Sequence, residues 1–166
     1  STMNVLLCGA SGFLGRHISA ALVRAGHAVR SASRHSAHAV DFNQATTAAT
    51  WRPLLRDIDA VVNAVGVLRD STRQPMTALH AAAPKALADA CAQAGVRRVV
   101  HISALGIDGN PTGYARTKRE ADTHLLTLTS SGQLDAAVLR PSLIFGAEGE
   151  STRLLLALAR LPLLPL

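Results

Sequence analysis

The chain has 166 residues, of which 48% are hydrophobic and 17% are charged, and its 17 Lys and Arg against 11 Asp and Glu give a net charge of +6. This composition provides enough apolar material for a buried core and too little charge for a disordered chain, and the length suits one domain, or one domain and a fragment. Because the basic residues are spread along the chain and aromatic residues make up only 3%, we expect no nucleic-acid partner and favour an anionic small molecule.

The cysteines and the two ends of the chain favour a reducing compartment. Cys8 and Cys91 lie in apolar segments without metal-binding spacing, so we expect buried free thiols. The first residues lead directly into an apolar segment and show no secretory signal. The apolar stretch at 154–166 is shorter than the about 20 residues that a membrane-spanning helix needs. We therefore expect a cytoplasmic protein without a transmembrane segment.

Short apolar runs alternate with longer segments of helical period, which predicts an α/β fold with a doubly wound parallel sheet. We expect strands over Asn4–Cys8, Ala28–Ala32, His38–Phe42, Ala60–Val65, Val96–Ile102 and Ala136–Leu139. We expect helices over Phe13–Ala25, Thr46–Leu55, Met76–Ala94 and Thr112–Ser131, the first and third ending at Gly26 and Gly95. Arg97 and Arg98 are expected to cap the third helix and to stay in solvent.

A glycine-rich turn joins the first strand to the first helix. Gly9, Gly12 and Gly15 stand at the spacing GxxGxxG. In a dinucleotide site, such glycines allow the tight turn, the approach of backbone to pyrophosphate and the close packing of the helix, whose N-terminus faces the anion. The alternative is a tight turn without a ligand. The residues of this turn that we expect to contact a dinucleotide are Gly9, Ser11, Gly12, Phe13, Leu14 and Gly15.

The end of the second strand favours one dinucleotide over the other. An acidic residue there would bind the ribose 2′-hydroxyl of NAD, whereas an arginine suits the 2′-phosphate of NADP. The chain has no acid at this point but has Ser33 and Arg34, whose guanidinium offers a planar set of donors. We therefore expect NADP, with NAD as the alternative. After the third strand, Asp41 and Phe42 are expected beside the adenine.

Three further residues fit a proton-transfer site. Tyr114 is the only tyrosine, and Lys118 is one of two lysines; at a spacing of four residues they share one helical face. An ammonium group lowers the pKa of a neighbouring phenol, and the hydroxyl of Ser103, after the fifth strand, can bind the same carbonyl oxygen. Ser103, Tyr114 and Lys118 thus predict proton transfer coupled to hydride transfer, the alternative being a solvated or packing face.

These motifs together resemble the short-chain dehydrogenase/reductase superfamily in its extended or atypical branch. The segments that carry the resemblance are GASGFLG at 9–15, Asp41-Phe42, Asn63-Ala64-Val65-Gly66, HISALG at 101–106, YARTK at 114–118 and RPSLIFG at 140–146. They are similar to those of NAD-dependent epimerase/dehydratase-like proteins and of bacterial relatives of the short-chain-dehydrogenase-like accessory subunit of respiratory complex I.

The resemblance implies a Rossmann fold and a set of site residues. It implies that Tyr114 is the general acid/base, that Lys118 binds the nicotinamide ribose and that Ser103 orients the substrate oxygen. The further cofactor contacts that it implies are Ala64, Val65, Gly66, Pro141, Leu143 and Ile144.

Three functions remain open at this point. The first is an NADP-dependent oxidoreductase that transfers hydride to or from a small carbonyl or alcohol. The second is a non-catalytic NADP-binding module, structural or redox-sensing, like the complex I subunit. The third is a nucleotide-sugar epimerase or dehydratase, which the short gap between Ser103 and Tyr114 disfavours.

The length of the chain bears on its domains and partners. Extended members of the superfamily are roughly twice as long, so we expect a dinucleotide-binding domain at 1–150 and the start of an incomplete substrate lobe at 151–166. The apolar face of that last segment is expected to meet a second subunit or the missing lobe. We expect the dinucleotide and a small-molecule substrate as ligands. No metal site is expected, because the seven histidines show no metal-binding motif.

Overall fold

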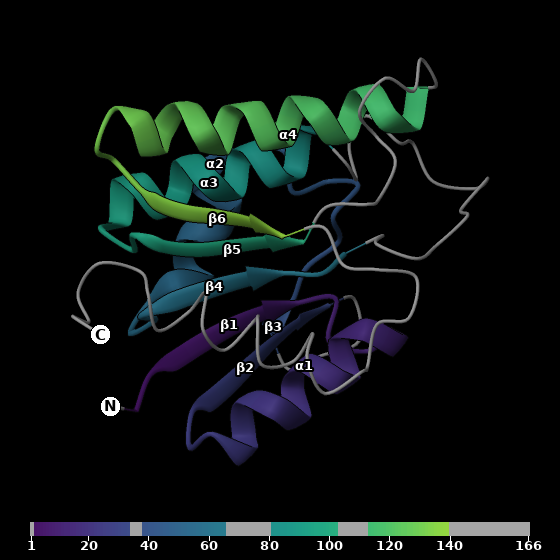
Figure 1. Cartoon of the computed structure of the whole chain (residues 1–166), viewed down its shortest axis with the longest axis vertical. Helices are drawn as coiled ribbons and strands as arrows, with labels where there is room; N and C mark the ends of the chain where they lie inside the picture. Colours follow the sequence, from purple (N-terminus) through teal and green to yellow (C-terminus); the bar gives the residue numbers. More distant parts are fainter. Residues whose placement is uncertain (1, 34–37, 66–80, 103–112, 140–166) are drawn as a thin grey trace.

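The computed structural model describes residues 2–33, 38–65, 81–102 and 113–139, and at Phe13, His38 and residues 113–118 it describes the backbone alone. Within these residues, six parallel strands form one sheet in the order β3-β2-β1-β4-β5-β6 (Figure 1). The strands are β1 (Asn4–Cys8), β2 (Ala28–Ser33), β3 (His38–Ala39), β4 (Ala60–Asn63), β5 (Arg98–Ile102) and β6 (Asp135–Leu139). The predicted α/β fold with a doubly wound parallel sheet is confirmed.

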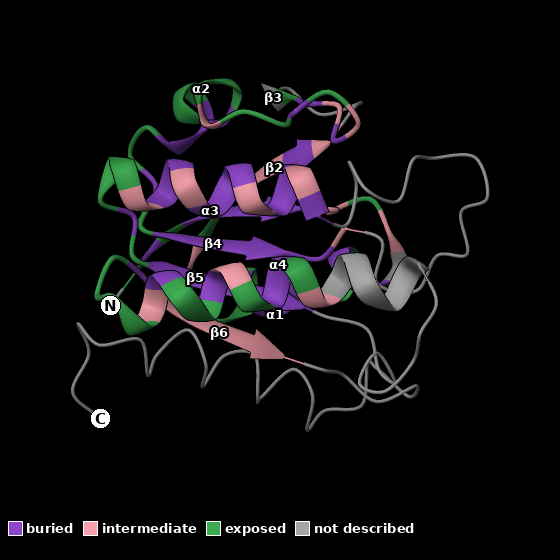
Figure 2. Ribbon diagram, turned by 90° about the horizontal axis from the view of Figure 1, so that it is seen from above, coloured by how far each residue is buried: buried purple, intermediate pink, exposed green. Residues whose placement is uncertain are grey.

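Helices cover both faces of this sheet (Figures 1 and 2). On one face, α1 (Phe13–Arg24) packs against β1 and β2. On the other face lie α2 (Ala48–Trp51), which continues as a 3-10 turn η1 (Arg52–Leu55), α3 (Ala83–Ala94) and α4 (Gly113–Ser130). The predicted helix ends at Gly26 and Gly95 are confirmed, since both glycines have positive φ just after α1 and α3.

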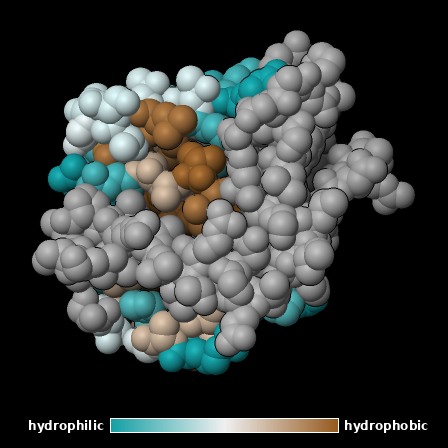
Figure 3. All heavy atoms as spheres, viewed as in Figure 1, coloured by the Kyte–Doolittle hydropathy of each residue, from teal (hydrophilic) through white to brown (hydrophobic). Residues whose placement is uncertain are grey.

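Alternate residues of the central strands face two separate layers of the core. Val5 and Leu7 of β1 pack with Ile18 and Leu22 of α1, whereas Leu6 belongs to the layer beneath α3 and α4. β4 and β5 are buried along their whole length, and β6 at the edge is half-buried (Figure 2). Figure 3 shows one concentrated apolar area on the β6 side of the sheet, among described residues that are otherwise mostly neutral or hydrophilic. The core therefore lies mainly around β1, β4 and β5.

Among the predicted elements that are shorter in the structure, the third strand and the second helix end early for local reasons. The third strand ends at Ala39 because Asp41 turns the chain: its carboxylate accepts the backbone N–H of Asn43 at 2.9 Å. The helix predicted over Thr46–Leu55 is α-helical only to Trp51. Pro53 has no N–H for the next α-helical bond, so the chain continues as the 3-10 turn η1.

The expectation for Arg98 is wrong. Its side chain is 6% exposed, and its Nη1 lies 3.1 Å from the sulfur of Met3. Successive residues of a strand face opposite sides of the sheet, and the position of Arg98 on β5 directs its side chain to the side where Met3 lies. Arg97 remains at the surface but does not cap α3: its Nη2 donates to the carbonyl of Gly132 at 3.2 Å and lies 3.1 Å from Oδ2 of Asp135.

Cys8, at the end of β1, and Cys91, on α3, are buried free thiols, as predicted. Burial raises the pKa of both thiols, to about 12 for Cys91. Neither is therefore a thiolate near neutral pH, and neither suits the role of a nucleophile.

None of the described helices combines the length and the apolar character that a membrane-crossing segment requires.

Candidate functional site

The strand order reverses at the centre of the sheet. From β1 the chain runs outward through β2 and β3, and it then continues through β4, β5 and β6 on the other side of β1. At such a reversal, the segments after the two central strands diverge and leave a crevice outside the carboxyl ends of the strands. Cys8 and Asn63, the last residues of β1 and β4, are paired neighbours. The candidate site therefore lies beyond these two residues.

The turn after β1 fits against the segment after β4 because Gly9 has no side chain. The φ of Gly9 is +82°, in the left-handed region, and a Cβ there would lie 2.9 Å from the carbonyl carbon and oxygen of Ala64. The N–H of Gly9 donates to the carbonyl of Ala32 on β2 at 3.4 Å. The turn is thus held between the two strands that flank β1.

Gly15 brings the first turn of α1 onto the same glycine turn. A Cβ on Gly15 would lie 1.9 Å from the carbonyl oxygen of Gly9 and 2.8 Å from the Cα of Ala10. The role predicted for Gly15 was close packing of the helix on the sheet. The structure shows that the tightest contact is with the turn itself, so the position of α1 depends on this glycine.

Within the part of the chain that the structure describes, the N-terminus of α1 at Gly12 is open. Gly12 is the N-cap residue and makes no side-chain cap, and the first turn of α1 has no acidic residue. The first N–H groups of an α-helix have no partner within the helix, so this end carries a partial positive charge. Among the described residues, a Cβ on Gly12 would meet nothing nearer than the carbonyl oxygen of Gly9 at 3.6 Å. Such an open, positive helix end binds phosphate oxygens, so the residues present fit a pyrophosphate group.

The other predicted residues of the turn differ in what they can offer a ligand. Ser11 is exposed, so its hydroxyl is available. The side chain of Leu14 is buried in the layer of the core beneath α1, so only its backbone can face the crevice. The side chain of Phe13 lies outside the described residues.

Residues predicted around the adenine and the ribose lie along the same edge of the sheet. Ser33 ends β2, the strand next to β1. Asp41 is half-buried, and one of its carboxylate oxygens holds the turn after β3. The ring of Phe42 is buried and packs edge-on against Trp51, with 5.0 Å between the ring centroids. Phe42 can therefore contact a ligand only through its backbone.

Buried polar side chains lie behind the carboxyl end of β4. Asn63 accepts the N–H of Val65 on its Oδ1 at 3.1 Å, and its Nδ2 lies 3.3 Å from Nδ1 of His101 on β5. Nε2 of His101 lies 3.4 Å from Oδ1 of Asp122 on α4. Asn63, His101 and Asp122 are 3%, 1% and 4% exposed. We call these three side chains the buried relay, because they link the segment after β4 to α4.

The sequence predicted this relay only in part. His101 was expected to be a satisfied core side chain. Its place in the core is confirmed, but the 3.4 Å contact of its Nε2 with Asp122 is not a hydrogen bond in the structure. Asn63 was singled out only as part of the segment Asn63-Ala64-Val65-Gly66. Asp122 was missed. Tyr114, Lys118 and Asp122 follow one another at a spacing of four residues, so the sequence could have predicted that Asp122 lies on the same helical face as the other two.

The predicted proton-transfer residues are placed by the backbone of α4. Tyr114 and Lys118 lie in its first turns, on one face, as the spacing requires. Their side chains lie outside the described residues, as do the whole of Ser103, Arg34, Gly66, Pro141, Leu143 and Ile144.

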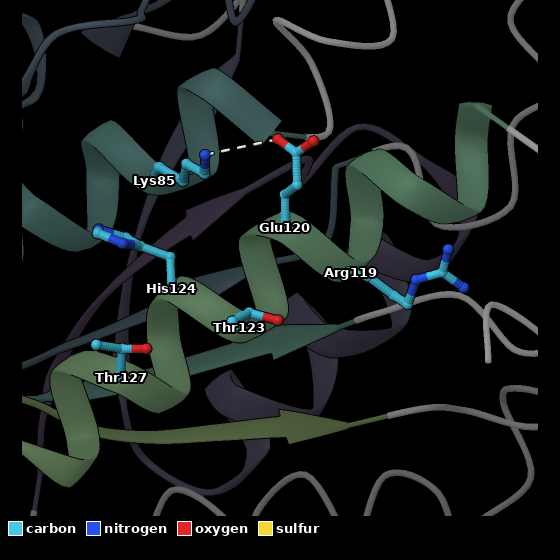
Figure 4. A pocket seen from close by; sticks show the side chains of 6 residues that line it. All are labelled: Lys85, Arg119, Glu120, Thr123, His124 and Thr127. Atoms are coloured by element: carbon cyan, nitrogen blue, oxygen red, sulfur yellow. Dashed lines mark ion pairs between the residues drawn. The ribbon is translucent and has the colours of Figure 1, made fainter. Parts of the chain in front are cut away.

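A second hollow, the α3–α4 groove, lies between the exposed sides of these two helices (Figure 4). It has a volume of about 490 Å³ and is lined by Lys85, Arg119, Glu120, Thr123, His124 and Thr127. Nζ of Lys85 lies 3.5 Å from Oε2 of Glu120, and Nε2 of His124 lies 2.7 Å from Oδ1 of Asp89 on α3. Opposite charges thus pair across this groove, unlike the open positive end of α1.

Within the described ranges, no three side chains of His, Cys, Asp or Glu gather in a way that would hold a metal ion.

Comparison with known proteins gives one family and several distant relatives. The family model described as the NAD dependent epimerase/dehydratase family matches residues 5–161. The UDP-glucose 4-epimerase of Vibrio cholerae is 23% identical over 171 residues, which cover 86% of this chain and 52% of that protein. Sterol demethylase protein B of Methylococcus capsulatus is 28% identical over 173 residues, with coverages of 87% and 52%. The chain thus spans about half the length of these curated relatives.

Solved structures share the fold at low sequence identity. The Bordetella bronchiseptica enzyme WbmH, solved in complex with NAD+, aligns with a TM-score of 0.65 and 21% identity over 84% of this chain and 56% of WbmH. This similarity confirms the architecture of the sheet and helices.

Proposed function

Because the chain belongs to the NAD dependent epimerase/dehydratase family, we propose that it binds a nicotinamide dinucleotide across the carboxyl ends of β1 and β4. The observation that carries the proposal is the open N-terminus of α1 at Gly12, which has no side-chain cap and no acidic residue in its first turn. The pyrophosphate lies there, beside Gly9 and Gly15, at the point where the strand order reverses.

The proposed dinucleotide is NADP. Ser33 and Arg34 receive the 2′-phosphate, because the end of β2 provides donors and no acid. The carboxylate of Asp41 and the backbone of Phe42 face the adenine. The proposed contacts after β4 are Ala64, Val65 and Gly66, and those around the nicotinamide are Lys118, Pro141, Leu143 and Ile144.

The proposed reaction is hydride transfer to or from a small carbonyl or alcohol. A bound nicotinamide supplies the hydride donor or acceptor. In the oxidative direction, the phenolate of Tyr114 takes the hydroxyl proton while the carbon–hydrogen bond breaks with its electron pair, so that the alcohol becomes a carbonyl. Lys118 stabilises the phenolate through its positive charge, and Ser103 donates a hydrogen bond to the substrate oxygen.

A second candidate is epimerisation of a nucleotide sugar, because one relative is named UDP-glucose 4-epimerase. The two reactions share the first hydride step and differ in its outcome: an epimerase returns the hydride to the same substrate, and an oxidoreductase does not. We assign the dinucleotide domain to 1–150 and the start of a substrate lobe to 151–166.

Calorimetric titration with NADPH and NADH tests the cofactor. We expect tighter binding of NADPH, and we expect Arg34→Ala to weaken NADPH binding by about tenfold or more while leaving NADH binding unchanged, since a charge-assisted contact to phosphate is lost. Arg24→Ala, at the far end of α1, is the matched control. Equal affinities would refute the assignment of NADP, and no binding of either dinucleotide would refute the proposed function.

Replacement of Tyr114 tests the reaction. Tyr114→Phe is expected to bind the dinucleotide as the wild type does and to lose at least about a hundredfold in turnover of a carbonyl substrate, because the proton carrier is removed. Binding without turnover in both proteins would instead support the non-catalytic module.

A further inference from the structure

We propose that Asn63, His101 and Asp122 are positioning residues: the buried relay holds the helix that carries Tyr114 and Lys118 in place against the segment after β4. This inference rests on the proposed function, which provides the proton-transfer pair that the relay positions. Neither the motifs nor the family match assigns a role to His101 or Asp122.

Only one amide orientation of Asn63 and one position of the proton on the His101 ring fit the contacts of the buried relay. The N–H of Val65 can only donate, so the atom that faces it is Oδ1 of Asn63, and Nδ2 must face His101. Because Nδ2 is also a donor, Nδ1 of His101 must be an unprotonated acceptor. The ring is therefore neutral, with its proton on Nε2, the nitrogen that lies 3.4 Å from Oδ1 of Asp122.

Each member of the relay comes from a different element. Asn63 on β4 and His101 on β5 are direct partners in the parallel register, so their side chains leave the same face of the sheet, the one that α4 covers. On α4, Asp122 follows Lys118 by four residues and Tyr114 by eight, which places all three on one helical face. A rotation or slide of α4 that displaces the pair must therefore also separate Asp122 from His101.

Burial makes this separation costly. Removing the partner of a buried polar group lowers the free energy of unfolding, because water does not take the place of that partner. His124 on α4 forms a second pair of the same chemistry with Asp89 on α3, and these side chains are 29% and 44% exposed. Water can replace a lost partner in that pair, so His124 and Asp89 form a matched control.

The tautomer of His101 tests the relay without cofactor or substrate. In a long-range ¹H–¹⁵N spectrum of the wild type at neutral pH, we expect a neutral ring protonated on Nε2, assigned by its loss in His101→Phe. In Asn63→Asp a carboxylate faces Nδ1 in place of the amide, and we expect an imidazolium ring. A wild-type ring that is protonated on Nδ1 would overturn the relay.

The ionisation of Tyr114 tests the positioning. Because Tyr114 is the only tyrosine, an alkaline absorbance titration reports its phenol alone. Lys118→Met is expected to raise the titration midpoint by about one pH unit, since the ammonium group that favours the phenolate is gone. This variant establishes that the pair exists, and it sets the scale for the relay variants.

The relay is then replaced by apolar side chains. The double variant His101→Phe/Asp122→Leu removes both polar partners together, so we expect a urea midpoint close to that of the wild type. We expect its phenol midpoint to rise by about half a unit or more. Loss of the Asp122 charge alone would lower the midpoint, so a rise reports displacement of Lys118 from Tyr114. If the double variant does not fold, His101→Phe alone, which keeps the charge of Asp122, is expected to show a smaller rise.

The control and the outcomes separate this inference from the proposed function. His124→Phe/Asp89→Leu is expected to leave the phenol midpoint unchanged. A shift in Lys118→Met without one in the folded relay variants would overturn the positioning role alone, and equal shifts in relay and control variants would do the same. No shift in Lys118→Met would overturn the proton-transfer pair, and the positioning role with it, while the tautomer still decides whether the relay exists.

Discussion

The two sides of the candidate site are built by opposite means. After β1, the backbone is shaped by side chains that are missing: Gly9 and Gly15 allow approaches that a Cβ would block. After β4, the backbone is shaped by side chains that are present: Asn63 holds the N–H of Val65 and also contacts His101. The first arrangement is steric and fails when an atom is added. The second is hydrogen-bonded and fails when a partner is removed.

This difference decides how large the effect of a substitution is. An added methyl group that meets backbone atoms cannot escape by changing rotamer, so the chain itself must move. A removed polar group leaves its partners unsatisfied, and the cost is limited to their desolvation. Substitutions at Gly9 or Gly15, where a Cβ would meet backbone atoms, should therefore destabilise the protein more than substitutions in the buried relay.

The largest effect is expected for Gly15→Ala. The new Cβ would lie 1.9 Å from the carbonyl oxygen of Gly9, so α1 must separate from the turn. We expect a loss of at least about 4 kcal/mol in the free energy of unfolding, measured by urea denaturation.

Gly12→Ala is the matched control, because its Cβ would meet no atom of the described part of the chain nearer than 3.6 Å. We expect a loss of less than about 1 kcal/mol in the free energy of unfolding, together with weaker binding of the dinucleotide. Equal losses of stability in Gly12→Ala and Gly15→Ala would contradict the steric account of the turn.

A smaller effect is expected for Asn63→Leu. This change keeps the volume of the side chain but leaves the N–H of Val65 and Nδ1 of His101 without their partner. We expect a loss of about 2–4 kcal/mol in the free energy of unfolding, since two buried polar groups become unsatisfied. Asn4→Leu, at an exposed strand asparagine that donates to the carbonyl of Asp57, should cost less than about 1 kcal/mol. A cost no larger than that of the control would show that the relay does not stabilise the fold.

The same contrast explains what the sequence could predict. A steric requirement for a missing Cβ can be recognised from the sequence, because glycine is the only residue without one. The spacing of Gly9, Gly12 and Gly15 therefore predicted the turn correctly. The alternation of apolar runs and helical segments likewise predicted the sheet, because burial on both faces requires it. Both signals are local, and each is visible within a few residues of the chain.

The relay depends on information that is not local. Asn63 and His101 are 38 residues apart, and they meet only because the register of β4 and β5 pairs them. The burial of Arg98 has the same origin, since its place on β5 points it into the core. Asn63 also explains why β4 is shorter than predicted: its side chain takes the N–H of Val65, so the chain leaves the sheet. The spacing of hydrophobic residues along the sequence does not predict side-chain hydrogen bonds of this kind.

The smallest effect is expected for Asp89→Asn, which separates the influence of burial from that of chemistry. His124 and Asp89 make a shorter contact, 2.7 Å, than the 3.4 Å between His101 and Asp122, yet they are far more exposed. If distance decided the contribution to stability, Asp89→Asn would cost more than Asp122→Asn. Solvent competes for the exposed pair, so we expect a cost below about 0.5 kcal/mol that decreases further with added salt. Urea denaturation of both variants at low and high salt measures this. A larger, salt-sensitive cost for Asp89→Asn would mean that distance, not burial, ranks the two pairs.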